Sequence, residues 1–254
     1  MPEGPEVKTM VDRLQKFKGS NLKEINILSG RYKRHCPPTN IKEFKKTLPD
    51  KIDSINSKGK FIWIEMKSGW SIWITLGMTG HFVNRKMKHA HIQFKTGKGV
   101  FYKKDVRNFG CMFFCNDKKS LEKKISELGP DLIVETVTKD YLYNKIKSSR
   151  SKKTIAEYLL DQKVLSGVGN YVRADAMYLA GVNPFKNIQE LTKKEAENIQ
   201  KAVKKILRKN YKCQLKNYYC KFIIYGLEFT DKGEQIIKTK HKGRTIHWVP
   251  THQK

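Results

Sequence analysis

The chain opens with the heptapeptide Met1-Pro2-Glu3-Gly4-Pro5-Glu6-Val7. We expect Met1 to be removed, because proline is small, which leaves the Pro2 nitrogen as a secondary amine that can attack an electrophilic carbon and form an iminium. A free α-amino group titrates near pH ~8, about two units below lysine, so more of it is unprotonated at neutral pH. Glu3 and Glu6 put carboxylates beside this amine for proton transfer. Taken alone, the heptapeptide fits a second interpretation at least as well, an acidic, proline-started first turn of a helix.

The composition predicts a folded intracellular protein with no membrane segment. The 254 residues are enough for one large domain or two of ordinary size. The 39% of hydrophobic residues suffices for a core, and no apolar run approaches the ~20 residues of a membrane span. The acidic N-terminus lacks the apolar core of a signal peptide, so secretion is not expected. An odd, scattered set of cysteines suggests reduced thiols inside a cell: Cys36, Cys111, Cys115, Cys213 and Cys220.

Charge is the second informative feature of the sequence. Lys and Arg number 52 against 24 Asp and Glu, which gives a formal net charge of +28. Nucleic acid is the natural partner for such a surface, since counterion release supplies affinity. An anionic membrane is the second candidate, although no single amphipathic basic helix dominates the sequence. Part of the excess of basic residues reflects codon composition, because the sequence prefers lysine over arginine, as an AT-rich coding sequence would produce. The charge therefore favours a nucleic-acid partner and says nothing about chemistry.

The first half of the chain is predicted to be a helix followed by short strands. Apolar residues recur at helical spacing from Val7 to Phe17, which predicts a helix over about residues 5–18. β-branched and aromatic runs separated by turn signals then indicate an antiparallel sandwich or barrel. A short helix over Ser120–Leu128 is expected to end at Gly129-Pro130. The predicted strands are Leu22–Leu28, Phe61–Met66, Ser71–Leu76, His91–Phe94, Val100–Lys103 and Phe109–Phe114.

The second half is predicted to be helical and to end in strands. Thr192 with Glu195 forms a capping-box pattern that opens a long helix. We divide the chain into a β-sandwich domain over residues 1–128, a linker over 129–138 and a helical domain over 139–254, whose terminal hairpin covers about 222–254. The other predicted elements are helices over Tyr141–Lys147, Thr154–Asp161 and Tyr171–Ala180, and strand-like segments over Phe222–Tyr225, Gln235–Lys238 and Thr245–Val249.

A glycine-rich turn, Leu165-Ser166-Gly167-Val168-Gly169-Asn170-Tyr171, lies between two of the predicted helices. Glycines let backbone N–H groups approach a phosphate closely, and the following helix N-terminus favours an anion. The Asn170 side chain would add a donor. A helix–two-turns–helix element that holds a phosphate fits this pattern, and an ordinary corner between two helices fits it equally well.

Six segments, in this order along the chain, resemble the Fpg/Nei family of base-excision DNA glycosylases, and the resemblance covers nearly the whole sequence. It implies an α+β fold with two domains: an N-terminal antiparallel β-sandwich with flanking helices, and a C-terminal helix–two-turns–helix domain that ends in a β-hairpin. The matching segments are Met1–Val7, Ser57–Lys60, Leu76–Gly80, Asp105–Gly110, Leu128–Asp131 and Val168–Asn170.

The resemblance implies that Pro2 is the nucleophile of a bifunctional glycosylase and abasic-site lyase. Pro2 would attack C1′ of the damaged nucleotide and displace the base, and Glu3 would act as acid and base on the sugar. The iminium acidifies the C2′ proton, so that elimination breaks the 3′ phosphate bond and a second elimination can release the 5′ side. Lys60 matches the catalytic lysine position of the family, with Lys58 as its neighbour.

The resemblance also implies which residues hold DNA. Lys60, Asn170 and Arg244 would grip the phosphates of the damaged nucleotide. Met78, Arg107 and Phe109 would fill the space that the flipped base leaves. A core methionine, a surface arginine and a strand phenylalanine are their ordinary interpretations. Glu6 would support the pocket, and it fits a helix-start carboxylate equally well.

The chain departs from the family pattern at its C-terminal end. Many members carry a zinc finger of two Cys-x-x-Cys pairs, but here Val249 and His252 stand where the second pair would be. No familiar ligand spacing replaces these cysteines. We therefore predict a zincless finger, a β-hairpin that presents Arg244 without metal, and no cofactor. Such hairpins occur in the endonuclease VIII-like branch.

Two further features favour that branch, and with it oxidised pyrimidines and hydantoins as substrates. The segment Asn170–Asp175 resembles the form found there, and the stretch between Asn210 and Tyr225 leaves little room for a long loop over the lesion.

We expect damaged double-stranded DNA as partner, single-stranded DNA as a second candidate, a monomeric state, and a location at DNA in the nucleus or nucleoid. A catalytically silent damaged-DNA-binding protein of the same fold is the alternative function, and an RNA-binding protein would explain the charge alone.

Overall fold

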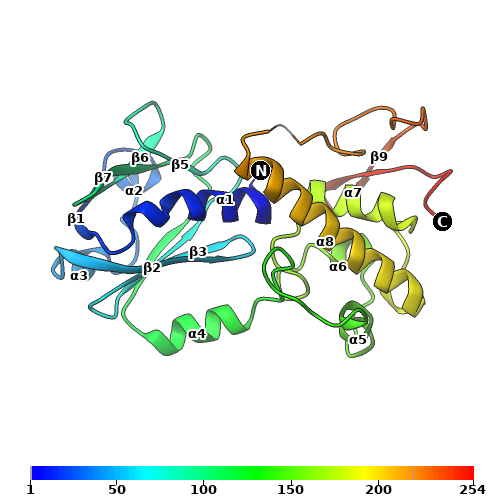
Figure 1. Ribbon diagram of the computed structural model, residues 1–254, viewed down its shortest axis with the longest axis horizontal. Helices are drawn as coiled ribbons and strands as arrows, with labels where there is room; N and C mark the ends of the chain where they lie inside the picture. Colours follow the sequence, from blue (N-terminus) through cyan, green and yellow to red (C-terminus); the bar gives the residue numbers. More distant parts are fainter. Residues whose placement is uncertain (1, 219) are drawn as a thin grey trace. The chain divides into compact units, whose positions relative to one another are not determined.

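The computed structural model describes residues 2–218 and 220–254. Met1, whose removal the sequence predicts, and Tyr219, within the predicted short connecting stretch, lie outside the described residues. The chain divides into two compact units (Figure 1). The first contains Pro2 and Glu6–Glu127, and the second contains Glu3–Pro5 and Leu128–Lys254. The second unit therefore includes three residues from the start of the chain, which a division by sequence position alone would assign to the first.

The first unit combines one N-terminal helix with eight strands among the described residues. Helix α1 (Gly4–Leu14) continues into the 3₁₀ turn η1 (Gln15–Phe17), which confirms the predicted helix. The strands are β1 (Asn21–Ile27), β2 (Asp50–Lys58), β3 (Phe61–Met66), β4 (Ser71–Thr75), β5 (His81–Val83), β6 (Ala90–Thr96), β7 (Gly99–Lys104) and β8 (Met112–Cys115). The short helices are α2 (Arg31–Arg34), α3 (Ile41–Lys45) and α4 (Lys118–Ser126).

All strand pairs of this unit are antiparallel, in the order β5-β7-β6-β1-β2-β3-β4-β8. The two halves of the sheet meet only at β1 and β2, where the register joins Asn21 to Lys51 and Leu22 to Asp50. One buried apolar cluster contains residues from both halves, such as Phe94 of β6 and Ile64 of β3. The two halves therefore enclose a common core, as the predicted sandwich requires.

Strand β2 is absent from the sequence-based expectation, and its geometry explains why. The register with β3 shifts between Ile52 and Ser54, which marks a β-bulge. Ile52 and Ile55 are both buried although they are three residues apart. A bulge inserts an extra residue, so the period-two alternation that identifies a strand in the sequence is broken at this point.

The second unit is built around the long helix α8 (Lys193–Leu215), the yellow-to-orange helix in Figure 1. Thr192 and Glu195 form the predicted capping box at its start. Helix α7 (Asn170–Ala180) packs against α8 around a buried apolar cluster that includes Val172 and Val203. The remaining helical elements are α5 (Tyr141–Lys147), α6 (Ile155–Tyr158) and the 3₁₀ turn η2 (Ile188–Glu190).

A two-stranded hairpin, β9 (Ile237–His241) with β10 (Arg244–Trp248), lies near the end of the chain. Its two turn residues, Lys242 and Gly243, both have positive φ, of 48° and 74°. This is the turn geometry whose twist matches that of antiparallel strands. The expected strand at Phe222–Tyr225 is wrong. Residues 223–225 donate their N–H groups to the Asp175 carboxylate, at 2.9, 3.0 and 3.1 Å, and not to a neighbouring strand.

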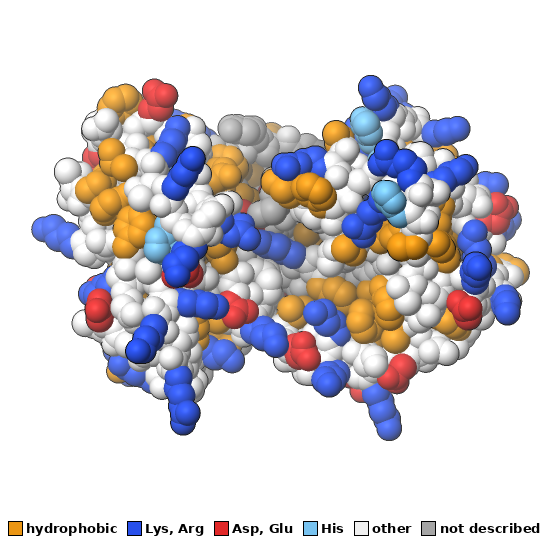
Figure 2. Space-filling model, turned by 180° about the vertical axis from the view of Figure 1, so that it is seen from behind, with side chains coloured by type: hydrophobic (Ala, Val, Ile, Leu, Met, Phe, Trp, Pro, Cys, Tyr) orange, Lys and Arg blue, Asp and Glu red, His pale blue; other side chains and the backbone are white. Residues whose placement is uncertain are grey.

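Basic side chains are widespread on the surface. Figure 2 shows Lys and Arg over both units on the visible face, with few acidic side chains between them. Such a surface favours a polyanionic partner. None of the helices in the described parts of the chain is long and apolar enough to span a lipid bilayer.

Candidate functional site

The Glu3 carboxylate binds the N-terminus of helix α7. It accepts hydrogen bonds from the backbone N–H of Tyr171 at 3.0 Å and of Val172 at 3.2 Å, and the residue is only 2% exposed. The first N–H groups of a helix have no partner within the helix, and its dipole favours a negative charge there. The predicted anion site at this helix start is thus occupied by a carboxylate of the protein itself.

The glycine-rich turn before α7 is shaped around Glu3 and Gly4. The Gly4 N–H donates to the Gly167 carbonyl at 2.9 Å. A Cβ atom on Gly169 would lie 2.2 Å from Cδ of Glu3, closer than any real contact. The Gln162 side chain closes the turn from the other side, because it accepts from the Gly167 N–H at 2.9 Å and donates to the Val168 carbonyl at 3.0 Å. The sequence identified these glycines and Glu3 separately, but not the contact between them.

Asn170 is the first residue of α7 and is half-buried beside this turn. Its Oδ1 atom is buried and has no hydrogen-bond partner within residues 2–218 and 220–254. Buried polar atoms are nearly always paired with protein or water. The Asn170 amide therefore retains hydrogen-bonding capacity at the end of the helix that also holds Glu3.

Arg173, one turn into α7, joins this helix to the terminal hairpin. Its guanidinium donates to the Thr245 carbonyl at 3.1 Å and to the Ala156 carbonyl at 3.4 Å. Burial and the charge of Arg244 lower the pKa of Arg173 to about 10, although the charge of Glu3 acts in the opposite direction. Arg173 thus lies within electrostatic reach of Glu3 and Arg244, and the sequence analysis did not identify it as a site residue.

Arg244 itself is exposed at the first position of β10, directly after the hairpin turn. The tight turn at Lys242-Gly243 sets its position along the hairpin, and the bond from Arg173 to Thr245 ties the adjacent backbone to α7. Arg173 therefore links α7, which begins at Asn170 and holds Glu3, to the strand that begins at Arg244; these three residues lie 167 and 74 positions apart in sequence (170 − 3 and 244 − 170).

The predicted catalytic residues Pro2 and Lys60 belong to the first unit, as does Glu6. Lys60 occupies the two-residue turn between β2 and β3 together with Gly59, which has a φ of 58°. Lys60 directly precedes β3, as expected. Pro2 and Lys60 are both half-buried, and Glu6 lies in the first turn of α1, where a carboxylate is favoured by the helix dipole.

Met78, Arg107 and Phe109 stand out as exposed side chains on two adjoining loops of the first unit. Met78 is 39% and Phe109 is 52% exposed, and the Arg107 guanidinium lies over the Phe109 ring at 4.9 Å. Gly77 makes the contact between the loops possible, because a Cβ there would lie 2.7 Å from the Gly110 nitrogen. The two predicted loop segments are therefore joined in space.

A buried carboxylate, missed in the sequence, holds these two loops in place. Asp105 accepts hydrogen bonds from the Thr79 hydroxyl at 2.5 Å and from the Gly110 N–H at 2.7 Å, and lies 3.7 Å from the Lys103 ammonium. The Thr79 hydroxyl in turn accepts from the Arg107 N–H at 2.9 Å. Although burial opposes ionisation, the bonds from Thr79 and Gly110 keep the pKa of Asp105 below its usual value.

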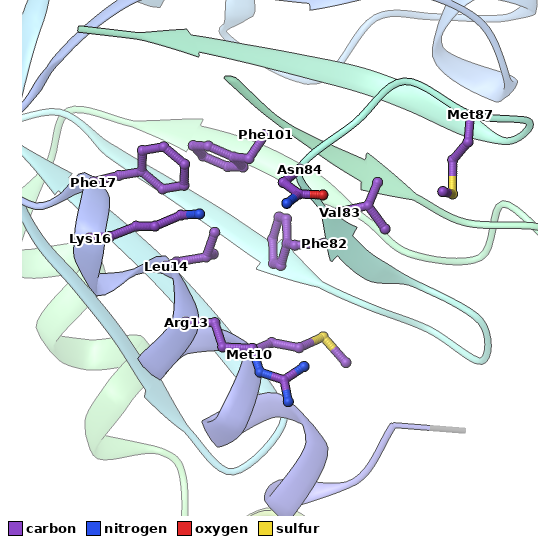
Figure 3. A pocket seen from close by; sticks show the side chains of 10 residues that line it. All are labelled: Met10, Arg13, Leu14, Lys16, Phe17, Phe82, Val83, Asn84, Met87 and Phe101. Carbon is purple, nitrogen blue, oxygen red and sulfur yellow. The ribbon is translucent and has the colours of Figure 1, made fainter. Parts of the chain in front are cut away.

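A cavity of about 330 Å³ in the first unit lies apart from these groups (Figure 3). Helix α1 contributes Met10 and Arg13 to its wall, and β5 contributes Phe82 and Val83. None of the predicted catalytic or DNA-binding residues lines it. It is therefore not part of the candidate site.

The C-terminal hairpin is held by apolar and hydrogen-bonded contacts. Val249 is 1% exposed within a buried cluster that includes Ile224 and Tyr178. The His252 ring packs on the Tyr178 ring at 4.5 Å, and its Nε2 atom bonds the Tyr178 carbonyl at 2.9 Å. No group of three or more His, Cys, Asp or Glu residues in the described part of the chain is arranged to hold a metal ion. Val249 and His252 thus both contact Tyr178 or the buried cluster that contains it.

The sequence matches two profiles of known families. One, described as the formamidopyrimidine-DNA glycosylase N-terminal domain, matches residues 1–112, and the other, the formamidopyrimidine-DNA glycosylase H2TH domain, matches residues 128–217. The formamidopyrimidine-DNA glycosylase of Proteus mirabilis is 31% identical over 218 residues, which cover 83% of this chain and 76% of that protein.

Solved structures of Lactococcus lactis Fpg have the same fold. The structure bound non-covalently to DNA with an AP site superimposes with a TM-score of 0.85 at 26% identity, over 99% of each chain. The structure with DNA that contains an oxidised pyrimidine gives a TM-score of 0.85 at 25% identity, over 100% of each chain. The predicted two-domain α+β fold with a terminal hairpin is thereby confirmed.

Substituting Gly169→Ala should displace the Glu3 carboxylate from α7. The new Cβ cannot coexist with Glu3 in its present position, so we expect the free energy of unfolding to fall by about 1–3 kcal/mol. In a Glu3→Ala background the clash is absent, so Gly169→Ala should lower the free energy of unfolding by clearly less than it does in the wild-type protein. Urea unfolding of the four proteins measures this coupling. An equal loss of unfolding free energy in both backgrounds would contradict the close contact between Gly169 and Glu3.

We expect the purified protein to contain no stoichiometric zinc. Metal analysis by mass spectrometry should find well under one zinc per chain, and a chelator should leave the thermal unfolding midpoint unchanged. A structural zinc site contributes directly to folding, so its removal would lower that midpoint. One bound zinc per chain would overturn the zincless hairpin.

Proposed function

The chain belongs to the formamidopyrimidine-DNA glycosylase family, and from this membership we propose that it is a DNA glycosylase of base excision repair that also cleaves the abasic strand through Pro2. Membership supports the glycosylase activity on damaged DNA. The lyase activity, the residue roles and the lesion preference are our inferences. The observation that carries them is the Glu3 carboxylate, fixed on α7 directly next to the proline.

After removal of Met1, the Pro2 nitrogen bonds C1′ of the damaged nucleotide. The base leaves with the electrons of the glycosidic bond and takes up a proton. Opening of the sugar ring gives an iminium, and loss of the C2′ proton then expels the 3′ phosphate. Glu3 is suited to carry protons for ring opening, because its carboxylate is oriented by two backbone N–H groups and sheltered from water.

The phosphates of the damaged nucleotide are assigned to Lys60, Asn170 and Arg244. The ammonium and guanidinium groups supply charge, and the Asn170 amide supplies a hydrogen-bonding group with spare capacity. Arg173 acts as a positioning residue, since its bond to Thr245 ties the Arg244 hairpin to the helix that starts at Asn170. Glu6 supports the pocket from the first turn of α1.

The pair of exposed loops is assigned to the space left by the extruded base. Met78 is adaptable, Arg107 can bond the orphaned base, and Phe109 can wedge between base pairs. Met78 and Phe109 are among the large apolar side chains that are exposed in the described part of the chain, and their place on adjoining loops supports a role in binding. Because Asp105 holds both loops in place, these loops do not need to become ordered when DNA binds.

For the substrate we propose oxidised pyrimidines and hydantoins in duplex DNA, with the endonuclease VIII-like branch as the nearer analogy and a monomer as the active form. The short connection after α8 supports this, because α8 extends to Leu215 and the Asp175-bound segment begins at Ile223. Lactococcus lactis Fpg, of the same fold, has been crystallised with DNA that contains an oxidised pyrimidine.

Borohydride trapping tests the proline mechanism. Wild-type protein should form a covalent adduct with lesion-containing duplex, because borohydride reduces the iminium. Pro2→Glu blocks removal of Met1 and eliminates the proline amine, so trapping should fall at least about 100-fold. Its affinity for a duplex with an uncleavable abasic-site analogue should stay within about threefold, since the DNA contacts remain.

Two outcomes would contradict the mechanism. Trapping by Pro2→Glu at the wild-type level would require another nucleophile. Binding by the wild-type protein with neither adduct nor strand scission, after mass spectrometry has confirmed that Met1 is absent, would favour the alternative of a catalytically silent damaged-DNA-binding protein.

A set of lesion-bearing oligonucleotides tests the substrate proposal. We expect oxidised pyrimidine and hydantoin duplexes to be nicked at least about tenfold faster, as kcat/KM, than an 8-oxoguanine duplex, a difference of about 1.4 kcal/mol in transition-state binding. Single-stranded versions should be slower substrates. A preference for 8-oxoguanine would reject the branch assignment and leave the family unchanged.

A further inference from the structure

The C-terminal end of α8 reverses the chain through a specific cap. Asn217 has a φ of 56°, the Tyr218 N–H donates to the Cys213 carbonyl at 2.9 Å, and the Asn217 N–H donates to the Gln214 carbonyl at 3.1 Å. This pair of bonds around a left-handed residue is a Schellman motif. It turns the chain back over the last turn of the helix, so residues after the cap return toward Cys213.

This reversal brings two thiols together. The Sγ atoms of Cys213 and Cys220 lie 2.7 Å apart, and both residues are half-buried. Cys36 and Cys111 are exposed and Cys115 is buried, and none of these three contacts another cysteine among the described residues. Cys213 and Cys220 are therefore the one dithiol in the described part of the chain.

We propose that Cys213 and Cys220 form a reversible intramolecular disulfide, and that the oxidant is a low-molecular-weight disulfide that carries carboxylates. The family relationship assigns no function to this pair, and the proposal does not depend on the glycosylase mechanism.

The surroundings of Cys213 favour an anionic oxidant. Cys213 lines a groove of about 550 Å³, and the remaining lining residues are five cations and a tyrosine: Lys205, Arg208, Lys209, Lys212, Lys216 and Tyr218. Clustered positive charge raises the local concentration of anions. The negatively charged carboxylates of such a disulfide would therefore draw it to the groove that Cys213 lines.

The exchange proceeds in two balanced steps. The Cys213 thiolate attacks one sulfur of the small disulfide, which forms a mixed disulfide and releases one small thiolate. Cys220 then loses its proton and attacks Sγ of Cys213, which releases the second thiolate. Two protein thiols are oxidised, one small disulfide is reduced to two thiols, and the protons pass to the released thiolates.

Cys220 is suited to the second step. Burial is the main cause, and the hydrogen bond with Cys213 the second, that raises the pKa of Cys220 to about 11. The Cys220 thiol therefore reacts slowly with free reagents. Its proximity to Cys213 compensates for this within the molecule, because intramolecular attack has a high effective concentration. A mixed disulfide on Cys213 should therefore be short-lived.

The disulfide would stabilise a segment that supports α7. Cys220 is three residues before Ile223, whose N–H is the first of the three that Asp175 accepts. Phe222 packs on the Tyr171 ring at 4.9 Å, and the Tyr171 N–H holds Glu3. A covalent link from Cys220 to α8 restricts opening of residues 220–225, so their amide exchange should slow.

Peptide mapping of oxidised protein tests the proposal. We would incubate the full chain with oxidised glutathione, alkylate the remaining thiols under denaturing conditions, and analyse the digest by mass spectrometry. We expect a cross-link between the peptides of Cys213 and Cys220, three alkylated cysteines, and full reversal by a thiol reductant. Hydrogen exchange of residues 223–225 should slow on the order of tenfold in the oxidised protein.

Two single substitutions serve as controls. Cys213→Ser should abolish the cross-link and the slowing of exchange, whereas Cys36→Ser, at an exposed and unpaired thiol, should leave both intact. Stable glutathione adducts on Cys213 or Cys220 without a cross-link would overturn the proposal. So would a cross-link that pairs either residue with another cysteine. Every readout here is a cross-link or an exchange rate and none is glycosylase activity. A failure of the disulfide proposal is therefore distinct from a failure of the glycosylase function.

Discussion

The structure depends above all on one buried carboxylate at one helix start. Glu3 accepts the N–H groups of Tyr171 and Val172, and a side chain at position 169 would collide with it. This interaction satisfies N–H groups that α7 cannot satisfy itself, and it compensates the cost of burying the carboxylate. It also explains why Glu3–Pro5 belong to the second compact unit. The start of the chain is thereby tied to α7, whereas an unattached terminus would be poorly ordered.

Helix α7 organises the rest of the second unit through two charged residues that are two positions apart, Arg173 and Asp175. Arg173 reaches the hairpin through the Thr245 carbonyl, and Asp175 accepts three N–H groups from residues 223–225. Both groups are almost fully buried, so each needs its partners to offset desolvation. The hairpin is thus attached to α7 by the hydrogen bond from Arg173 to the Thr245 carbonyl, and Val249, just after the hairpin, packs in a buried apolar cluster.

In the first unit, too, a buried carboxylate holds separate segments together through hydrogen bonds. Exposed Met78 and Phe109 gain nothing from burial, and their loops are held instead by the Asp105 carboxylate beneath them. Asp105 lies within a segment that the sequence had singled out, but its own role was not visible. A buried acceptor is recognised by its donors, and one of these, Thr79, lies 26 positions earlier in the chain.

Most of the elements could be predicted from sequence because their signals are local. The capping box at Thr192 and the helix over about residues 5–18 each depend on residues within one or two helical turns. The prediction failed at β2, where a bulge breaks the alternation, and at residues 223–225, whose N–H groups bond a distant carboxylate. The sequence by itself determined the family, the two-part organisation and the residue types suited to the chemistry. Only the tertiary structure decided that Glu3 binds α7, that Arg173 binds the hairpin and that Asp105 binds Thr79, because hydrogen bonds between remote segments leave no periodic pattern in the chain.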